Sequence, residues 1–313
     1  MELVFLGTPE FAVPTLERAI AAGHRVLAVF TQPDRPKGRG GKLAASPVKL
    51  AALRHGIPVH QPERVRRPDT VELLRNMQPR AMVVVGYGQI LPQSIIDIPP
   101  LGIVNVHASL LPKYRGAAPV QWAIANGETR TGVTIMRIDA GLDTGNMLLK
   151  WETAIGPEEN ALELGARLAD AGADLLVRTL AGLDAGTIPP EPQDSSQATH
   201  APILKKENGR IDWSMSAPQI FNRMRGFLPW PGAYTSFRGQ GMHVWKARLT
   251  EEPGEGTPGR LSATAGRLLA ECGGGSMLEL LEVQLEGRKR MPAAAFLQGH
   301  RIEPREILGG PTR

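Results

Sequence analysis

Apolar residues in the first 140 positions come in short continuous runs, separated by segments with helical spacing. Runs rich in Val, Ile and Leu predict strands at residues 3–6, 26–31, 81–87, 102–107 and 132–138. Continuous apolar strands that alternate with helices are typical of a sheet buried on both faces. The pattern therefore predicts an α/β domain with a mostly parallel sheet.

Two of the helices are predicted to begin at a hydroxyl side chain followed by proline. Thr8 and Ser46 each stand directly before a proline. A hydroxyl at this position accepts a hydrogen bond from a backbone N–H of the first helical turn. Proline is tolerated in that turn, because its missing N–H would have no partner within the helix. A longer amphipathic pattern over residues 158–183 predicts the helix that closes this domain.

The second part of the chain has a different pattern. Residues 187–203 contain four prolines and little apolar periodicity, which predicts an interdomain linker. Short strand-like runs broken by glycines follow and indicate a small β-barrel. We therefore expect a domain over 1–186, a linker over 187–203 and a second domain over 204–313.

Length and composition agree with two well-packed globular domains. The chain has 313 residues, against a prior of roughly 150 residues per domain, and 42% of them are hydrophobic. No apolar run approaches the roughly 20 residues that a membrane span requires, and the first residues lack the basic start of a signal peptide. Cys272 is the only cysteine, which excludes an internal disulfide and fits a reducing compartment. We expect a soluble cytoplasmic protein with no membrane partner.

The net charge of +5 is unevenly distributed. From Lys205 onward there are 16 Lys and Arg against 11 Asp and Glu, so the whole excess lies in the last third of the chain. A basic surface attracts polyanions such as nucleic acids, although many ordinary solvated surfaces carry a similar excess. Charge alone leaves both interpretations open.

Two polar residues close one of the predicted apolar strands. Asn105 and His107 lie one residue apart, so their side chains share a face of the strand while Val106 points to the other. Asp143 lies in a glycine-rich loop after the next strand and could reach His107. A carboxylate fixes the tautomer of a neighbouring His, and an Asn amide can stabilise a developing oxyanion. Together they suit acyl transfer.

A covalent acyl-enzyme is not expected. The chain has no serine or cysteine in a G-x-S-x-G setting. The nucleophile would then belong to the substrate.

The chain resembles the 10-formyltetrahydrofolate-dependent formyltransferases over nearly its whole length. HASLLPKYRGAAPVQWAI followed by GVTIMRIDAGLDTG is similar to their signature region. Other segments resemble the branch of the family that formylates methionyl-tRNA: GTPEFAVPTLE, FTQPDRPKGRGGKL, PVKLAA, VVVGYGQILP, RIDWS and PWPGAY. The resemblance implies a Rossmann-like catalytic domain followed by a C-terminal OB-type β-barrel that binds tRNA.

The resemblance also implies roles for the three polar residues. Asn105 and His107 would polarise the formyl carbonyl, and Asp143 would orient His107 and an ordered water. The methionine amino group of initiator methionyl-tRNA would attack the formyl carbon of 10-formyltetrahydrofolate, the co-substrate. The product would be N-formylmethionyl-tRNA for translation initiation, and no metal is implied.

Two segments match the folate-contacting positions of the family. These are Ser109, Leu110, Leu111 and Pro112 in one turn, and Gln89, Ile90 and Leu91 in another.

The segment from 30 to 47 would by pattern alone be a flexible, solvent-exposed basic loop. In the family it enters the acceptor end of the tRNA, which implies tRNA contacts for Arg39, Arg35, Lys37 and Lys42. Lys206 matches a retained lysine at the linker end, whereas Ile203 replaces a lysine of the family; Lys205 is the candidate to restore that charge. Family members act largely as monomers, which implies a monomer here.

Three other functions compete with this reading. A sugar-amine formyltransferase would share the polar trio and the folate turn but not the basic loop and basic second domain. A non-catalytic RNA-binding module would not need the trio. A folate hydrolase would use water in place of the amine.

Overall fold

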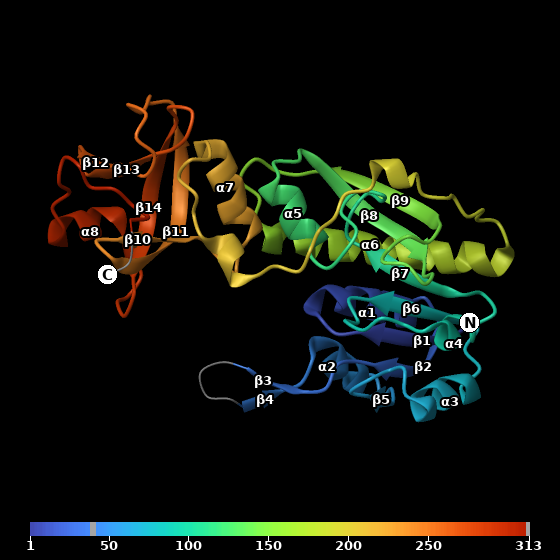
Figure 1. Cartoon of the computed structure of the whole chain (residues 1–313). Coiled ribbons are helices and arrows are strands. Elements are labelled where there is room, and N and C mark those ends of the chain that lie inside the picture. Colours follow the sequence, from blue (N-terminus) through green and yellow to red (C-terminus); the bar gives the residue numbers. More distant parts are fainter. Residues whose placement is uncertain (38–41, 311–313) are drawn as a thin grey trace. The chain divides into compact units, whose positions relative to one another are not determined.

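The computed structural model describes residues 1–37 and 42–310, which form two compact units. The first, here the sheet unit, comprises the described residues of 1–119, 130–154 and 164–202. The second, the barrel unit, comprises 120–129, 155–163 and the described residues from 203 onward. Figure 1 labels their elements. Among the described residues, no helix combines the length and apolar character of a membrane span.

The sheet unit is built on a seven-stranded sheet with the order β5-β2-β1-β6-β7-β8-β9. Its strands are β1 (Glu2–Gly7), β2 (Arg25–Phe30), β5 (Val59–His60), β6 (Ala81–Val85), β7 (Ile103–His107), β8 (Arg130–Arg137) and β9 (Met147–Ala154). Along this order, neighbouring strands from β5 through β2, β1 and β6 to β7 pair in parallel, while β8 pairs antiparallel with both β7 and β9. The predicted mostly parallel, Rossmann-like α/β sheet is confirmed.

Strand β9 had no counterpart among the predicted strands. From Leu149 onward its side chains alternate between partly buried and exposed, because β9 lies at the edge of the sheet. The edge position gives it the half-polar pattern of a strand that is covered on one side only.

Helices of the sheet unit connect and cover these strands. They are η1 (Glu10–Ala12), α1 (Val13–Ala21), α2 (Pro47–Arg54), α3 (Pro68–Asn76), α4 (Gln93–Ile96), most of α6 (Ala161–Ala185) and η2 (Ser195–Gln197). The predicted cap at Ser46 is confirmed, since its hydroxyl accepts the N–H of Lys49 at 3.0 Å. The predicted cap at Thr8 is wrong: its hydroxyl donates to the Tyr87 carbonyl at 3.2 Å, and the chain first forms the 3-10 turn η1.

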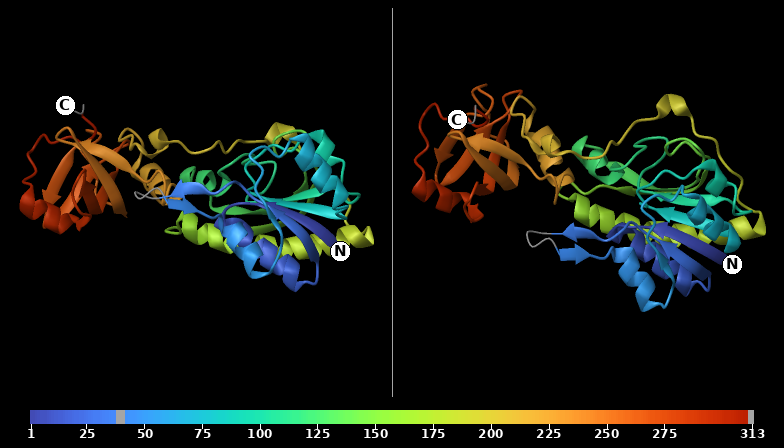
Figure 2. Two further views of the ribbon diagram at one scale, coloured as in Figure 1. Left: turned by 90° about the horizontal axis from the view of Figure 1, so that it is seen from below. Right: turned by 60° about the horizontal axis from the view of Figure 1, so that its bottom comes forward.

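Helix α6 packs directly on the sheet. A Cβ atom added at Gly172 would lie 2.8 Å from Val106 and 3.3 Å from Val133, so a larger residue would push the helix off β7 and β8. The views in Figure 2 show this long yellow-green helix running beside the green strands. Val106 therefore points to the face that α6 covers, and Asn105 and His107 point to the opposite face.

The described parts of the basic segment, residues 30–37 and 42–47, contain regular structure, although the composition predicts a flexible loop. Strands β3 (Arg35–Lys37) and β4 (Lys42–Ala44) pair antiparallel as a short ribbon. Near its base, Lys49 Nζ donates to Asp34 at 2.6 Å and to Gln61 at 2.8 Å. These bonds hold the start of the ribbon against the sheet unit.

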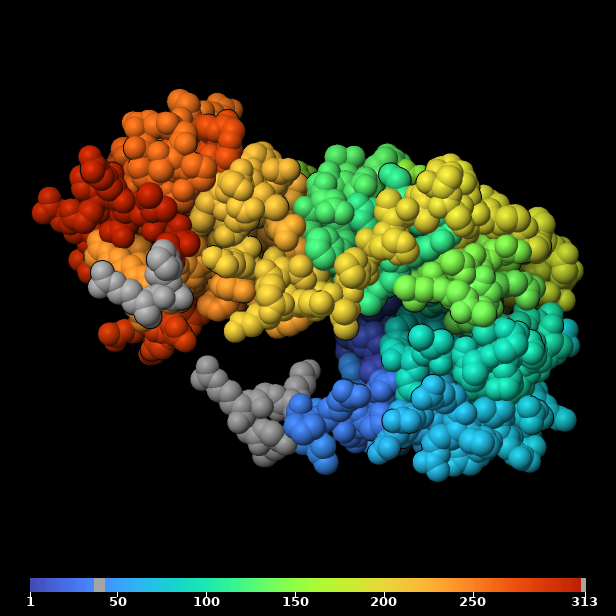
Figure 3. Space-filling model, in the orientation of Figure 1, coloured from blue at the N-terminus to red at the C-terminus, as the bar shows by residue number. Residues whose placement is uncertain are grey.

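Residues 187–202 belong to the sheet unit, although their four prolines predict an interdomain linker. Glu191 and Met147 exchange both backbone hydrogen bonds at 2.8 Å, and His200 bridges to Arg115. Figure 3 shows this yellow segment on the surface of the sheet unit. Proline prevents a regular helix or central strand but not irregular packing. The proposed functional domain boundaries at 186 and 204 stay a prediction.

The barrel unit contains an antiparallel sheet with the order β10-β11-β14-β13-β12, with β15 on β14. Its elements from residue 203 onward are η3 (Lys206–Gly209), α7 (Ala217–Gly226), β10 (Tyr234–Phe237), β11 (Gln240–Thr250), β12 (Leu261–Thr264), β13 (Arg267–Glu271), β14 (Met277–Leu285), β15 (Met291–Pro292) and α8 (Ala293–Gly299).

The last described residues connect the two ends of this sheet. Leu308 N–H donates to Gly259 at 2.8 Å beside β12, and Gly309 N–H donates to Ser236 in β10 at 2.9 Å. The segment thereby closes the sheet in the manner expected of a small barrel.

Two segments from earlier in the chain pack with the barrel unit. Trp122 of α5 (Pro119–Ala125) meets Phe227 edge to face, with ring centroids 5.3 Å apart. The buried Arg225 donates to the carbonyls of Gly156 at 3.0 Å and Glu159 at 2.8 Å. Sequence order alone gave no sign of this grouping, because each contact joins residues more than 60 positions apart.

Candidate active site

The structure brings Asn105, His107 and Asp143 together. Asn105 Nδ2 lies 3.4 Å from Asp143 Oδ1, and His107 Nδ1 lies 3.7 Å from Asp143 Oδ2. The route differs from the expected one, because β8 is antiparallel to β7 and ends beside Ile103. The loop after β8 therefore returns over the sheet face that carries Asn105 and His107.

His107 is held by both of its ring nitrogens. The side chain is only 5% exposed, and Nε2 lies 2.9 Å from the Tyr114 carbonyl. A carbonyl oxygen can only accept, so Nε2 carries a proton. The Nδ1 atom then faces the carboxylate, and it carries a proton as well only when the ring is an imidazolium.

Asp143 adopts an uncommon backbone conformation. Its φ of 52° lies in the left-handed region, which costs a non-glycine residue about 1 kcal/mol. Its Oδ2 atom accepts the Gly116 N–H at 2.8 Å. Gly116 has φ 120°, and an added Cβ would lie 2.7 Å from the Ala201 carbonyl, so only glycine fits there. The Gly116 N–H and the Asn105 amide thus donate to the carboxylate, and the His107 ring lies beside it.

Two residues that the sequence did not single out support this loop, one directly and the other through the first. Gln193 donates from Nε2 to the backbone carbonyls of Asp143 and Gly145, both at 2.8 Å. Arg115, which is buried, donates to Gln193 Oε1 from Nε at 3.0 Å and from a terminal nitrogen at 2.8 Å. Gln193 lies in the segment predicted as a linker, so no sequence signal marked it.

The predicted folate turn 109–112 is built around Thr134. The Thr134 hydroxyl donates to the Ser109 carbonyl at 2.7 Å and accepts the Leu111 N–H at 3.1 Å. Ser109 Oγ donates to the Lys113 carbonyl at 2.6 Å, and the Leu111–Pro112 peptide is cis. The polar groups of the turn are therefore satisfied by the protein, and its shape is fixed in advance. The folate contacts of Ser109, Leu110, Leu111 and Pro112 stay a prediction.

The second predicted folate segment follows β6. The Gln89 side chain is occupied by the protein, since it accepts the Val65 N–H at 2.7 Å and donates to the Pro62 carbonyl at 3.2 Å. Leu91 is buried, whereas Ile90 is 86% exposed, an unusual position for an isoleucine. Contacts of this segment with folate would thus come from its backbone and from Ile90.

The predicted tRNA contacts lie in two places. Arg35 and Lys37 belong to β3 and Lys42 to β4 of the sheet unit, while Lys206 begins η3 of the barrel unit. Arg39 lies outside the described residues. Ile203, at the position of the lost lysine, is exposed.

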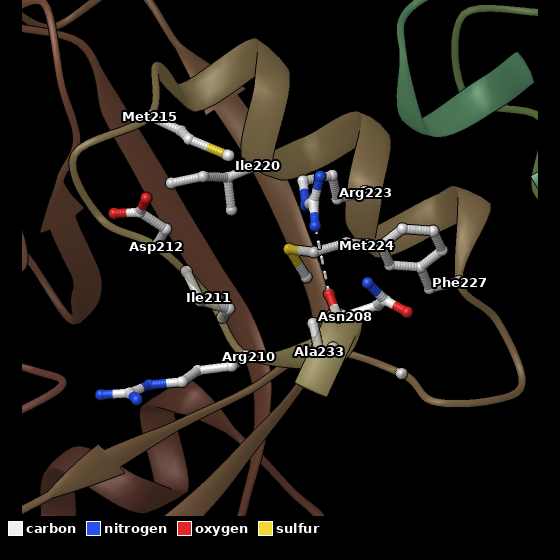
Figure 4. Close-up of a pocket in the computed structure, with 12 residues that line it drawn as sticks. Asn208, Arg210, Ile211, Asp212, Met215, Ile220, Arg223, Met224, Phe227 and Ala233 are labelled. Atoms are coloured by element: carbon white, nitrogen blue, oxygen red, sulfur yellow. Dashed lines mark hydrogen bonds between the residues drawn. The ribbon is translucent and has the colours of Figure 1, made fainter. Parts of the chain in front are cut away.

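The barrel unit has a small cavity of its own between η3, the following turn and α7 (Figure 4). Arg223 crosses it and donates to the Asn208 carbonyl at 3.4 Å. Its volume is about 10 Å³, which is room for no more than a single water. A folate or a nucleotide cannot enter it.

Among residues 1–37 and 42–310, no three His, Cys, Asp or Glu side chains gather as a metal site would require. The side chains that the structure brings together at the site are an amide, an imidazole and a carboxylate. These are groups that bind an oxyanion and move a proton.

Comparison with known proteins identifies relatives of both parts of the chain. Residues 1–180 match the family model described as "Formyl transferase", and residues 203–301 match "Formyl transferase, C-terminal domain". The chain is 67% identical to the methionyl-tRNA formyltransferase of Solibacter usitatus over 309 residues, which are 99% of both chains. It is 56% identical to that of Koribacter versatilis over 310 residues, again 99% of both.

A solved structure has a similar fold. A sugar 3N-formyl transferase, crystallised in the presence of dTDP and 5-N-formyl-THF, aligns with a TM-score of 0.67 over 92% of this chain and 99% of its own. The two sequences are 18% identical, so this likeness concerns the fold alone.

Proposed function

Because the chain belongs to the formyl transferase family in both its N-terminal and its C-terminal part, we propose that it formylates methionine on initiator methionyl-tRNA. The formyl donor is 10-formyltetrahydrofolate, and the product is N-formylmethionyl-tRNA for translation initiation. The observation on which this proposal rests is the 67% identity to a methionyl-tRNA formyltransferase across 99% of both chains. The match extends over both family domains of the chain.

The geometry of the trio supports direct transfer. The amino group of methionine attacks the formyl carbon, and the carbonyl oxygen becomes an oxyanion. Asn105 offers an amide donor, and the His107 ring lies on the same face of β7, where the two side chains would polarise the formyl carbonyl together. Donors aimed at a developing oxyanion typically contribute factors of about 100 to 1,000 to the rate.

Asp143 handles the proton in this scheme. The attacking nitrogen becomes an ammonium and passes one proton, through an ordered water, to the Asp143 carboxylate. Breakdown of the intermediate cleaves the bond between the formyl carbon and N10 of the folate, and N10 takes up one proton. The net change moves one proton from the amine to tetrahydrofolate, so no external acid or base is consumed.

The folate and tRNA contacts are part of the proposal. The turn 109–112 and the segment 89–91 would hold the folate, and the basic ribbon with Lys206 would contact tRNA phosphates. Arg39 would read the acceptor end, because a planar guanidinium offers several donors that an ammonium cannot reproduce.

We expect Arg39→Lys to reduce transfer to initiator tRNA and to narrow the preference over elongator tRNA. Lys42→Ala is the matched control, since it should weaken the binding of both tRNAs to the same extent and reduce the salt dependence of that binding. Kinetics on both tRNAs at two salt concentrations measure the two effects. An initiator-to-elongator ratio unchanged in Arg39→Lys would leave Arg39 as one phosphate contact among several.

We further propose that the protein acts as a cytoplasmic monomer. A single buried cysteine suits a reducing compartment, and one chain carries both family domains. Sedimentation with and without tRNA tests the monomer, since a dimer in either state would contradict it.

Formate release separates transfer from hydrolysis. The enzyme is mixed with 10-formyltetrahydrofolate, with or without methionine-charged initiator tRNA. We expect tetrahydrofolate to form only with the charged tRNA and without free formate. Formate release at a similar rate without tRNA would instead identify a folate hydrolase.

A further inference from the structure

The Asp143 loop, residues 139–145, needs support from outside itself. Asp143 has a left-handed backbone, and this conformation persists only where the surroundings over-determine it. Within the loop, Asp139 accepts hydrogen bonds from Gly141 N–H at 3.1 Å and Thr144 Oγ1 at 2.7 Å, and Asp139 is exposed. These internal bonds leave the carbonyls of Asp143 and Gly145 to be held by another segment.

Gln193 supplies that support, and both the nitrogen and the oxygen of its amide are hydrogen-bonded. Both of its N–H groups donate to the loop, one to the Asp143 carbonyl and one to the Gly145 carbonyl, each at 2.8 Å. Its oxygen accepts two bonds from Arg115. Only this orientation of the amide is possible, because carbonyls only accept and a guanidinium only donates.

Arg115 joins this support to the rest of the trio. Its neighbour Gly116 donates to the Asp143 carboxylate at 2.8 Å, and its other neighbour Tyr114 accepts from His107 at 2.9 Å. Both ends of Asp143, the carboxylate and the backbone, are therefore tied to residues 114–116.

The segment that carries Gln193 also holds residues 114–116. Thr199 accepts the Tyr114 N–H through its hydroxyl at 2.9 Å and the Arg115 N–H through its carbonyl at 2.8 Å. Ala201 N–H donates to the Arg115 carbonyl at 2.7 Å. Gln193, Thr199 and Ala201 thus brace the site from outside, which a passive linker would not do.

We propose that Gln193 is a positioning residue for Asp143, held in place by Arg115, and that Thr199 and Ala201 hold the segment 114–116 that contacts both Asp143 and His107. This inference rests on the proposed function of Asp143 in proton transfer. Loss of the Gln193 amide would release the two loop carbonyls, so that the carboxylate no longer stays in line with Asn105 and His107.

Gln193→Glu is the sharpest variant. It keeps an acceptor for Arg115 but replaces the donor of the two loop bonds with an oxygen that repels both carbonyls. Gln197→Ala is the matched control, because Gln197 lies in the same segment, is exposed and donates to Asp194. The rate constant kcat, both KM values and the melting temperature are measured in the full chain, with and without Asp143→Asn.

We expect Gln193→Glu to lower kcat by about 10- to 100-fold, the cost of misplacing a reacting group by an ångström or less. Both KM values should change little, and Gln197→Ala should leave kcat unchanged. In the Asp143→Asn background, Gln193→Glu should cause almost no further loss, because both changes act through one group. A residue that only stabilises the fold would lower the melting temperature and reduce activity equally in both backgrounds.

Several outcomes would overturn the inference. These are wild-type kcat in Gln193→Glu, an equal loss in both backgrounds, or the same loss in Gln197→Ala. If Gln193→Glu does not fold, Arg115→Lys replaces it: it keeps the charge but loses the paired contact, and wild-type kcat in that variant would count against the inference. Near-normal activity of Asp143→Asn alone would instead refute the proposed function of Asp143, and this inference with it.

Discussion

Two carboxylates, one in each unit, have surroundings that differ in the way a proposed chemical role and a stabilising role require. Glu279 of β14 is 6% exposed and lies between two guanidiniums, 2.7 Å from Arg248 and 2.9 Å from Arg267. Asp143 is 16% exposed and contacts an amide, an imidazole and a backbone N–H. Two guanidiniums pair with Glu279, whereas the partners of Asp143 are two neutral N–H donors and an imidazole, as the proposed uptake of a proton by Asp143 requires.

The difference extends to the backbone. Glu279 lies in a regular strand, paired on both sides with β11 and β13. Asp143 lies in a left-handed conformation that depends on a remote segment. The barrel unit places its charged pair where no rearrangement is needed, and the sheet unit places its carboxylate on a loop that is held under strain.

Replacement of each carboxylate by the corresponding amide, in Asp143→Asn and Glu279→Gln, should separate the chemical role from the stabilising role most strongly. We expect Asp143→Asn to lower kcat by about 100- to 10,000-fold, the usual range for a general acid or base. Folate binding should stay largely intact, because Asp143 acts on the amine and on His107. Single-turnover formyl transfer and folate titration measure the two quantities. Glu279→Gln is the matched control and should keep wild-type kcat per folded molecule.

The melting temperature, unlike kcat, should respond to the exchange of Glu279. The hydrogen bond from Arg267 holds the pKa of Glu279 below its usual value; burial acts against this shift and Arg248 adds to it. A carboxyl whose pKa is lowered on folding stabilises the folded state above its unfolded pKa, and this contribution is lost as the pH falls through the folded pKa. Glu279→Gln should therefore lower the melting temperature by several degrees at pH 7.

The pH profile checks the sign of this effect. The difference in melting temperature between wild type and Glu279→Gln should shrink as the pH falls below about 4.5, the ordinary value for Glu. A difference that persists or grows in acid would show that packing, and not charge, is what Glu279 contributes.

The smallest effect concerns another ionisable group in the core of the barrel unit. Burial raises the pKa of the Cys272 thiol to about 12. At pH 8 only about one molecule in 10,000 would carry a thiolate. We expect the native protein to react with a thiol reagent far more slowly than the urea-unfolded chain, with no loss of activity during the exposure. Fast labelling of the native state would indicate that the barrel unit opens readily.

The sequence was sufficient for the elements that obey a local rule. Buried Val and Ile runs predicted five strands of the sheet, and the i, i+2 spacing placed Asn105 and His107 on one face. Strand β9 was missed because half of its side chains are solvated, and the antiparallel pairing of β8 depends on tertiary contacts that no local pattern records. The trio was expected to meet, but by a different path of the chain.

The support of the site was harder to predict. Gln193 is one glutamine in a proline-rich segment, and its role depends on two carbonyls 48 and 50 positions earlier. Trp122 and Arg225 are similar, since each contacts a partner far away in the sequence. Residues that act through long-range hydrogen bonds to backbone groups leave no periodicity in the sequence.

Transfer of labelled formyl from 10-formyltetrahydrofolate tests the central claim most directly. The acceptors are methionine-charged initiator tRNA, methionine-charged elongator tRNA and a nucleotide-linked amino sugar, each at the same concentration. We predict rapid labelling of the initiator, weaker labelling of the elongator and none of the sugar. Labelling of the amino sugar with the initiator tRNA left unmodified would contradict the account.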